Sequence, residues 1–194
     1  MRLLPPLAPA SLALLALLLA ACGAPSYYLL PPPAAAARQA SPAGTIVVAD
    51  VAVPTYVDAV EIASLTGPET VDLSKKSLWA DTPRRALTRH LAAALDERLA
   101  ARVGTEPWPA FDSPGLRVEV IIDRMIGAPG ASLDFTGQYA IVTANGSLRA
   151  FDRFALAVPV ADGGYPALMA AHATAMDRLA DRIATRISGR ALAS

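Results

Sequence analysis

The chain has 194 residues with 17 basic and 17 acidic side chains, so its formal net charge is zero. This balance gives no sign of the basic excess that binds nucleic acid or an anionic surface. The single cysteine leaves no pair for an intramolecular disulfide, so the stability of the fold must come from packing.

The first 21 residues have the features of a bacterial signal peptide. Arg2 supplies a positive start, and the apolar run Leu12–Leu19 is short for a membrane-spanning helix. Leu19–Cys22 fits the lipobox, in which small residues precede a cysteine that becomes lipidated. An ordinary secretory signal, or a short membrane anchor with an incidental cysteine, is the alternative. We predict a covalent lipid on Cys22 and no other cofactor.

A tether and one domain are expected after the leader. Removing residues 1–21 leaves about 173 residues, enough for one sizeable core. We assign 22–44 to a lipidated tether and linker, and 45–194 to the domain. Tyr27–Leu30 has strand chemistry but is stopped by prolines, whereas Ala34–Gly44 is small, polar and typical of a linker.

The first half of the domain predicts strands followed by a helix. Thr45–Pro54 is a β-branched run ended by proline, and Val60–Leu65 and Glu69–Leu73 flank a turn in a hairpin-like pattern. A helix is expected to begin with Thr82 as its cap and Pro83 at its first position, and to close at Gly104. Its apolar stripe is formed by leucines that recur every four residues, Leu87, Leu91, Leu95 and Leu99.

An antiparallel meander follows. Leu116, Val118, Val120 and Ile122 alternate with polar residues in its first strand, and Leu133, Phe135, Tyr139 and Ile141 share one face of its second. Asn145-Gly146 predicts a two-residue type I′ turn. The third strand, Ser147–Val160, carries Pro159, which suggests a sheet edge. A second amphipathic helix starts near Pro166 and ends at Gly189.

These elements predict an α/β fold with a mixed, largely antiparallel sheet and two main helices packed on it. The search for catalytic motifs gives no phosphate loop, no dinucleotide fingerprint and no nucleophile elbow. His90 and His172 lie on separate expected helices, so we expect packing roles for both and no metal site. We therefore expect no enzyme activity.

Three further sets of residues keep two interpretations each. Asp123 and Asp134 lie on neighbouring strands and could approach each other, but a solvated outer face is the favoured interpretation. Arg84, Arg85 and Arg89 could meet anionic headgroups or an acidic partner, and again a solvated helix face is favoured. Loop aromatics serve either at binding surfaces or as lids on a core; those here are Tyr27, Tyr28, Tyr56, Trp79 and Trp108.

Several segments in order resemble the ABC-type transport auxiliary lipoproteins, the PqiC-like family. The lipobox is followed by Tyr27-Tyr28-x-Leu30, Val53–Asp58 is similar to the family's V-P-x-Y-L-D, and Leu78–Asp81 is similar to its R-W-A-E stretch before a helix. Arg153-Phe154 and Gly164–Met169 resemble the last strand and the start of the last helix. Ala59–Ala63 and Asp81–Pro83 depart from the family pattern.

This resemblance implies a fold akin to the TolB N-terminal or anticodon-binding architecture. It also implies a periplasm-facing, lipid-anchored domain that works beside an ABC permease and ATPase and an MCE-type substrate-binding protein, in lipid transport between membranes. Gly23 after the cysteine, in place of an inner-membrane retention Asp, favours the outer membrane. A structural envelope-assembly lipoprotein and a direct small-lipid binder are the alternatives. The oligomeric state stays open, with a homo-oligomer among the alternatives.

The segment Pro54–Ala63 is the expected docking surface, because apolar residues after a strand-ending proline tend to remain exposed in a connection. An aromatic with a polar tip makes a good anchor, which favours Tyr56, although Tyr56 as a cap on the core is the equal alternative. The residues assigned to partner binding are Pro54, Tyr56, Val57, Ile62 and Trp79.

Overall fold

The computed structural model describes residues 24–108 and 113–189. Cys22 and the leader therefore lie outside the described residues. In chain order the elements are β1 (Ser26–Tyr28), β2 (Thr45–Val48), α2 (Thr55–Asp58), β3 (Glu61–Gly67), β4 (Thr70–Trp79), α3 (Pro83–Arg98), β5 (Arg102–Thr105), β6 (Leu116–Gly127), β7 (Ser132–Thr143), β8 (Leu148–Pro159) and α4 (Gly164–Ile187).

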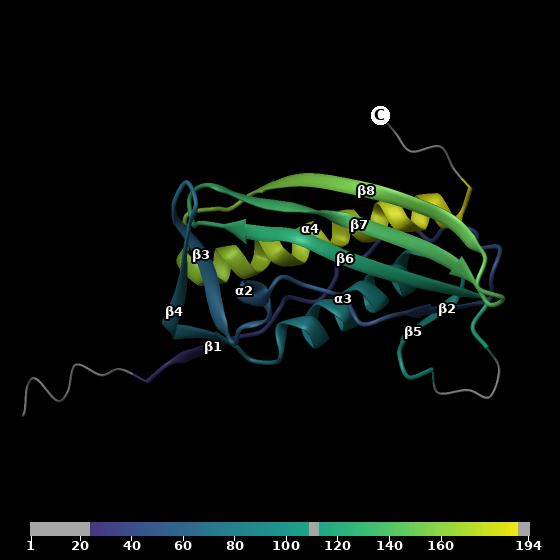
Figure 1. The fold of residues 1–194 in the computed structure, drawn as a ribbon, viewed down its shortest axis with the longest axis horizontal. Helices are drawn as coiled ribbons and strands as arrows, with labels where there is room; N and C mark the ends of the chain where they lie inside the picture. Colours follow the sequence, from purple (N-terminus) through teal and green to yellow (C-terminus); the bar gives the residue numbers. More distant parts are fainter. Residues whose placement is uncertain (1–23, 109–112, 190–194) are drawn as a thin grey trace, which may run out of the picture.

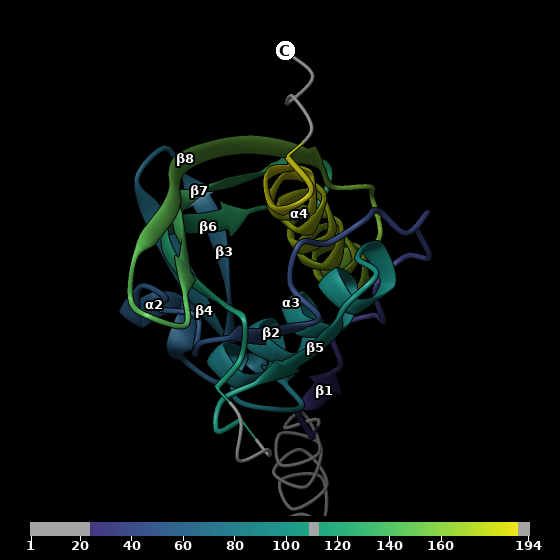
Figure 2. The same cartoon turned by 90° about the vertical axis from the view of Figure 1, so that its right-hand side faces the viewer.

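Two sheets share one core. The larger sheet has the order β5-β2-β6-β7-β8, and the smaller has the order β1-β4-β3. β2 runs parallel to both of its neighbours, β5 and β6, whereas the pairs β6–β7 and β7–β8 are antiparallel. Seen end-on, the large sheet curves around α3 and α4 (Figure 2). The predicted class, a mixed and largely antiparallel sheet with two main helices packed on it, is confirmed.

The meander forms as its alternation predicts. Leu133, Phe135, Tyr139 and Ile141 are all buried, at most 2% exposed, and they face the same core as the leucines of α3. Gly137 lies on this face because no side chain fits there: a Cβ would come within 2.2 Å of the Ile121 carbonyl oxygen and 2.7 Å of Phe154. β8 is an edge strand of the large sheet, as Pro159 suggested.

Helix α3 ends earlier than the sequence indicated. Leu99 already has extended backbone at φ −122° and ψ 142°, and Gly104 lies within β5, a strand that sequence reasoning missed. β5 forms because Arg102–Thr105 can pair parallel to β2. Thr82 is the residue before the helix, but its side chain makes no cap bond; its amide donates to the Asp81 carboxylate at 2.6 Å.

The turn between β7 and β8 differs from the predicted type I′. Only Gly146 has a positive φ, 82°, and Asn145 does not, whereas type I′ requires a positive φ at both positions. The loop has four residues, and the Gly146 amide donates to the Thr143 carbonyl at 2.9 Å. The Asn145 side chain instead accepts a bond from the Ser147 amide at 3.2 Å.

The small sheet lies at one end of the long axis, and the β7–β8 turn lies at the other (Figure 1). β1 pairs in parallel with the end of β4, so residues 26–28 of the expected tether are built into the sheet. β4 also carries a bulge of four residues. Ala63 pairs with Leu73 and Glu61 with Leu78, so the four residues Ser74–Ser77 stand opposite one residue of β3.

Candidate functional site

The residues assigned to docking do not form an exposed surface. Val57, Ile62 and Trp79 are 4%, 0% and 5% exposed and belong to the core. Their burial has a local cause, since Thr55–Asp58 turns into the short helix α2 and directs Val57 inward, while Ile62 already lies in β3. The expectation that these three side chains are exposed for docking is therefore wrong.

Tyr56 is half-buried, and its hydroxyl has a structural partner. The Met125 amide donates to this hydroxyl oxygen at 3.1 Å. Met125 follows the register shift in β6 between Ile122 and Arg124, where the strand ladder is interrupted. Tyr56 thus satisfies a backbone group at a bulge, which supports its role as a cap on the core.

The two histidines have different surroundings. His172 is buried on α4, where its Nδ1 donates to the Leu168 carbonyl at 2.7 Å and its ring meets Trp79 edge-on at 5.6 Å between ring centres. Burial lowers the pKa of His172 to about 4. The imidazole is therefore neutral near pH 7, and it acts as a packing group between α4 and the end of β4.

His90 belongs to a cluster that we call the N-terminal clamp: His90 and Arg98 of α3, Asp177 and Asp181 of α4, and the backbone of Pro31, Ala34 and Gln39. The Ala34 amide donates to Asp177 Oδ2 at 3.1 Å, and Arg98 Nη1 donates to the Ala34 carbonyl at 3.4 Å. The Gln39 amide donates to the Arg98 carbonyl at 2.7 Å.

The clamp holds the segment expected as a linker against both helices. Pro31–Pro33 cannot donate backbone hydrogen bonds, but the Pro31 carbonyl still accepts, and it faces His90 Nδ1 at 3.1 Å. The segment therefore attaches through carbonyls and the amides that follow the prolines. Residues 31–39 lie along the α3–α4 pair, not extended away from it.

Charge inside the clamp is balanced across the helix pair. Arg98, with a side chain 4% exposed, donates to Asp181 Oδ1 at 2.5 Å and lies 3.8 Å from Asp177. His90 Nε2 lies 3.2 Å from Asp177 Oδ1. Burial lowers the pKa of His90 and the Asp177 carboxylate opposes that shift. Both ring nitrogens face oxygen acceptors, so a neutral ring donates only one of the two bonds at a time.

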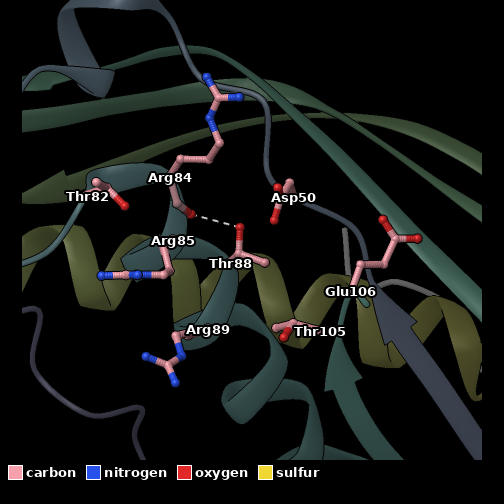
Figure 3. A pocket seen from close by; sticks show the side chains of 8 residues that line it. All are labelled: Asp50, Thr82, Arg84, Arg85, Thr88, Arg89, Thr105 and Glu106. Atoms are coloured by element: carbon pink, nitrogen blue, oxygen red, sulfur yellow. Dashed lines mark hydrogen bonds between the residues drawn. The ribbon is translucent and has the colours of Figure 1, made fainter. Parts of the chain in front are cut away.

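The three arginines near the start of α3 line a cavity of about 380 Å³ together with Asp50 and Glu106. Their guanidinium groups point in three different directions and do not converge (Figure 3). Arg84 pairs with Asp58 at 2.6 Å, and Arg85 pairs with Asp81. The hydrogen bond from Arg85 lowers the pKa of Asp81. This arrangement fits the solvated-face interpretation better than an anion site.

A second cavity of about 560 Å³ opens beside Trp108 and shares Asp50 and Glu106 with the first. Arg117 on its wall pairs with Glu106 at 2.8 Å, and this hydrogen bond lowers the pKa of Glu106. The wall therefore combines an aromatic ring with an ion pair, which differs from the long apolar pocket that a direct lipid binder needs.

The outer face of the meander carries apolar side chains among charged ones. Ile121, Leu148 and Phe151 are 46%, 64% and 51% exposed, and the pairing of Glu119, Ala140 and Phe151 places them in one row across β6, β7 and β8. Asp134 pairs with Arg124 at 3.5 Å, in agreement with the favoured solvated-face interpretation.

The described residues hold no group of three or more His, Cys, Asp or Glu side chains placed to bind a metal ion. Within the same residues, no helix has the length and apolar character needed to cross a membrane.

Comparison with known proteins decides the family. The model of the ABC-type transport auxiliary lipoprotein component matches residues 27–184. The chain belongs to this family. The match begins at the strand β1 and ends within α4, so it includes the clamp as well as both sheets. The predicted resemblance is confirmed.

Solved structures share the fold of this auxiliary lipoprotein chain. An uncharacterized protein seen by crystallography has a TM-score of 0.69 at 20% identity, over 85% of this chain and 99% of that one. A Xanthomonas campestris protein of the DUF330 family has a TM-score of 0.62 at 17% identity, over 84% and 96%. No curated protein matches the chain.

Sequence reasoning missed the clamp. One signal was present, since Arg98 falls seven residues after Leu91 and so continues the apolar stripe of α3 as a charged residue. A buried arginine needs an acidic partner, but nothing in the sequence identified the partners as Asp177 and Asp181, about eighty residues away.

Proposed function

We propose that this chain is a non-enzymatic, lipid-anchored accessory of an ABC transport system that moves lipids between membranes. The observation that carries the proposal is the family match over residues 27–184. The lipid is assigned to Cys22 and the anchored membrane to the outer membrane, since Gly23 follows the cysteine. The partner is an MCE-type substrate-binding protein that connects the chain to the permease and ATPase.

The outer face of the meander is the proposed docking surface for that partner. Its three exposed apolar side chains, Ile121, Leu148 and Phe151, have no role in the core, and exposed apolar groups gathered among charged ones are common at protein interfaces. This surface replaces the segment Pro54–Ala63, in which Val57, Ile62 and Ala63 are buried although Val60 is exposed.

The test is co-purification of the full lipidated chain from membranes of its native host, with partners and lipids identified by mass spectrometry. We expect the permease, the ATPase and the MCE-type protein, and their loss with Phe151→Asp. Ala155→Asp is the matched control, because Ala155 is exposed on the outer side of the same strand. Recovery of envelope-assembly proteins without any transporter component would refute the transport role.

The anchor is tested separately. Cys22→Ser should block lipidation and release the chain from membranes, and normal membrane-bound, lipidated product from this variant would refute the assignment.

A further inference from the structure

The end of the molecule next to the lipidation site carries most of its exposed apolar side chains. Among the described residues, eight large apolar side chains are strongly exposed, and five of them lie on or beside the small sheet: Tyr27, Leu29, Val60, Val71 and Leu73. Tyr27 and Leu29 are the extreme cases of this group, at 65% and 75% exposure. Such a concentration on a domain of this size calls for something to cover it.

The same end carries both lysines of the chain, Lys75 and Lys76; every other basic side chain is an arginine. Both lysines are exposed and lie in the β4 bulge Ser74–Ser77. The Ser74 hydroxyl holds this bulge, since it accepts from the Ser77 amide at 3.0 Å. Ser77 pairs with Ser26, the first residue of β1, so the lysines stand where the anchored segment enters the sheet.

The geometry of β1 fixes which of its side chains face outward. Tyr28 is half-buried, and its ring meets that of Tyr165 of α4 at 6.2 Å between ring centres. Neighbouring residues of a strand point to opposite faces, so Tyr27 points away from the core. Its partner across the pair of strands is Leu78, which is half-buried between the buried residues Ser77 and Trp79.

Chain length determines what can reach this surface. Five steps of about 3.8 Å join the Cα atoms of Cys22 and Tyr27, so the residue assigned to carry the lipid lies within about 19 Å of Tyr27. From β1 onward the chain is fixed to the domain, because β1 is paired with β4 and residues 31–39 are held by the clamp. A bilayer that takes up the lipid on Cys22 is therefore brought next to Tyr27.

We propose that the surface formed by Tyr27, Leu29, Val71, Leu73, Lys75 and Lys76 lies on the anchoring bilayer and that its two lysines contact anionic headgroups. This inference rests on the lipid anchor of the proposed function. A tyrosine suits the water–lipid interface because it has an apolar ring and a polar tip, and a lysine near an anionic surface strengthens attachment about fivefold. Three acidic residues belong to the same hairpin: Glu69 lies at its tip, Asp72 lies between Val71 and Leu73, and Glu61 pairs with Leu78.

This contact orients the domain. The small sheet faces the membrane, and the β7–β8 turn at the other end of the long axis points away from it (Figure 1). Phe151 and Leu148 near that turn are then directed toward the space between the membranes, where a partner protein approaches.

The experiment uses the full lipidated chain, reconstituted in vesicles of phosphatidylethanolamine and phosphatidylglycerol. Lipidation consumes the Cys22 thiol, so a cysteine introduced by Tyr27→Cys is the single site for an environment-sensitive fluorophore such as NBD. Leu148→Cys is the matched control, because Leu148 is 64% exposed against 65% for Tyr27 and is the first residue of β8, after the β7–β8 turn at the opposite end of the molecule. We expect at least a twofold rise in emission for Tyr27→Cys, quenched by spin-labelled lipid, and no change for Leu148→Cys.

The lysines are tested in the same system. Lys75→Ser with Lys76→Ser should reduce the lipid quenching at Tyr27→Cys several-fold in anionic vesicles, and phosphatidylcholine vesicles should give the same reduction with the native lysines. Equal quenching at both labelled positions, or a fluorophore at Tyr27→Cys that is shielded without lipid quenching, overturns the proposal. Vesicle flotation distinguishes the lipid anchor from the surface contact. A chain that fails to float overturns both the anchor and this inference. A chain that floats but shows no quenching overturns this inference alone.

Discussion

The inner face of the meander and the N-terminal clamp stabilise the same helices in different ways. The meander face is apolar throughout, with Leu133, Phe135 and Ile141 no more than 1% exposed. The clamp is nearly as buried at its centre, but it is built from charged and polar side chains, His90, Arg98 and Asp177, which are 3%, 4% and 14% exposed. Apolar burial contributes stability with little directional preference, whereas a charged cluster requires one arrangement of partners.

The difference assigns each region a separate task. Burial of the apolar face stabilises the packing of α3 and α4 on the sheet. The clamp fixes the path of residues 31–39 along the α3–α4 pair, because the backbone groups of this segment accept and donate at fixed places. Changes in the first region should therefore lower global stability, and changes in the second should release residues 31–39 at a smaller global cost.

The largest effect is expected from Leu95→Ala in the apolar region. Leu95 is fully buried in α3, so its truncation should lower the free energy of unfolding by about 2–5 kcal/mol. Glu97→Ala, at an exposed position of the same helix, should change it by less than about 0.5 kcal/mol. Denaturant melts of the two variants measure this, and equal effects would place the leucine stripe at the surface.

Acid should weaken the apolar region through His172. Its pKa is about 4 when folded and 6.5 when unfolded, so the unfolded state binds the extra proton between these values. Stability from this group is complete above pH 6.5 and is lost as the pH falls through 4. The loss amounts to about 3 kcal/mol. His172→Phe should remove this part of the pH dependence, and parallel ΔG–pH curves for the two proteins would contradict the assignment.

In the clamp, Arg98→Met should have a moderate global effect and a large local one. The methionine keeps much of the packing but leaves Asp177 and the Ala34 carbonyl without this partner. We expect a loss of about 2 kcal/mol, less than for a fully buried pair because Asp181 is 57% exposed. The hydrogen-exchange rates at the amides of Ala34 and Gln39 should rise by a larger factor than a global loss of this size would produce.

Arg89→Met, at an exposed position of the same helix, is the control and should leave exchange at both amides unchanged. If Arg98→Met raises exchange evenly across the meander and the N-terminal segment, the clamp has no separate role and the comparison between the two regions fails.

The same comparison explains what the sequence could predict. The meander and the helices follow from periodicity, since alternation in Leu116–Ile122 and the spacing of Leu87 and Leu91 are local patterns. The clamp joins Pro31, His90 and Asp177, whose separations of 59 and 87 residues leave no local signal. β5 was missed for a related reason, because four residues gain strand structure only by pairing with the distant β2. The expected exposure of Val57 and Ile62 was wrong because apolar composition does not distinguish an exposed connection from a short helix such as α2 or the start of a buried strand.

The smallest expected effect concerns Tyr56 and decides whether it is a cap on the core or a docking residue. Tyr56→Phe keeps the ring and removes only the hydroxyl that accepts from the Met125 amide. That amide then loses its partner at the β6 bulge, so the free energy of unfolding should fall by about 1–2 kcal/mol. Tyr27→Phe makes the same chemical change at a ring that is 65% exposed, and it should cost less than about 0.5 kcal/mol. Partner recovery from membranes should be unchanged with Tyr56→Phe, because the ring caps the core. A variant with wild-type stability and weakened partner recovery would instead make Tyr56 a docking residue and restore the segment Pro54–Ala63 as an interface.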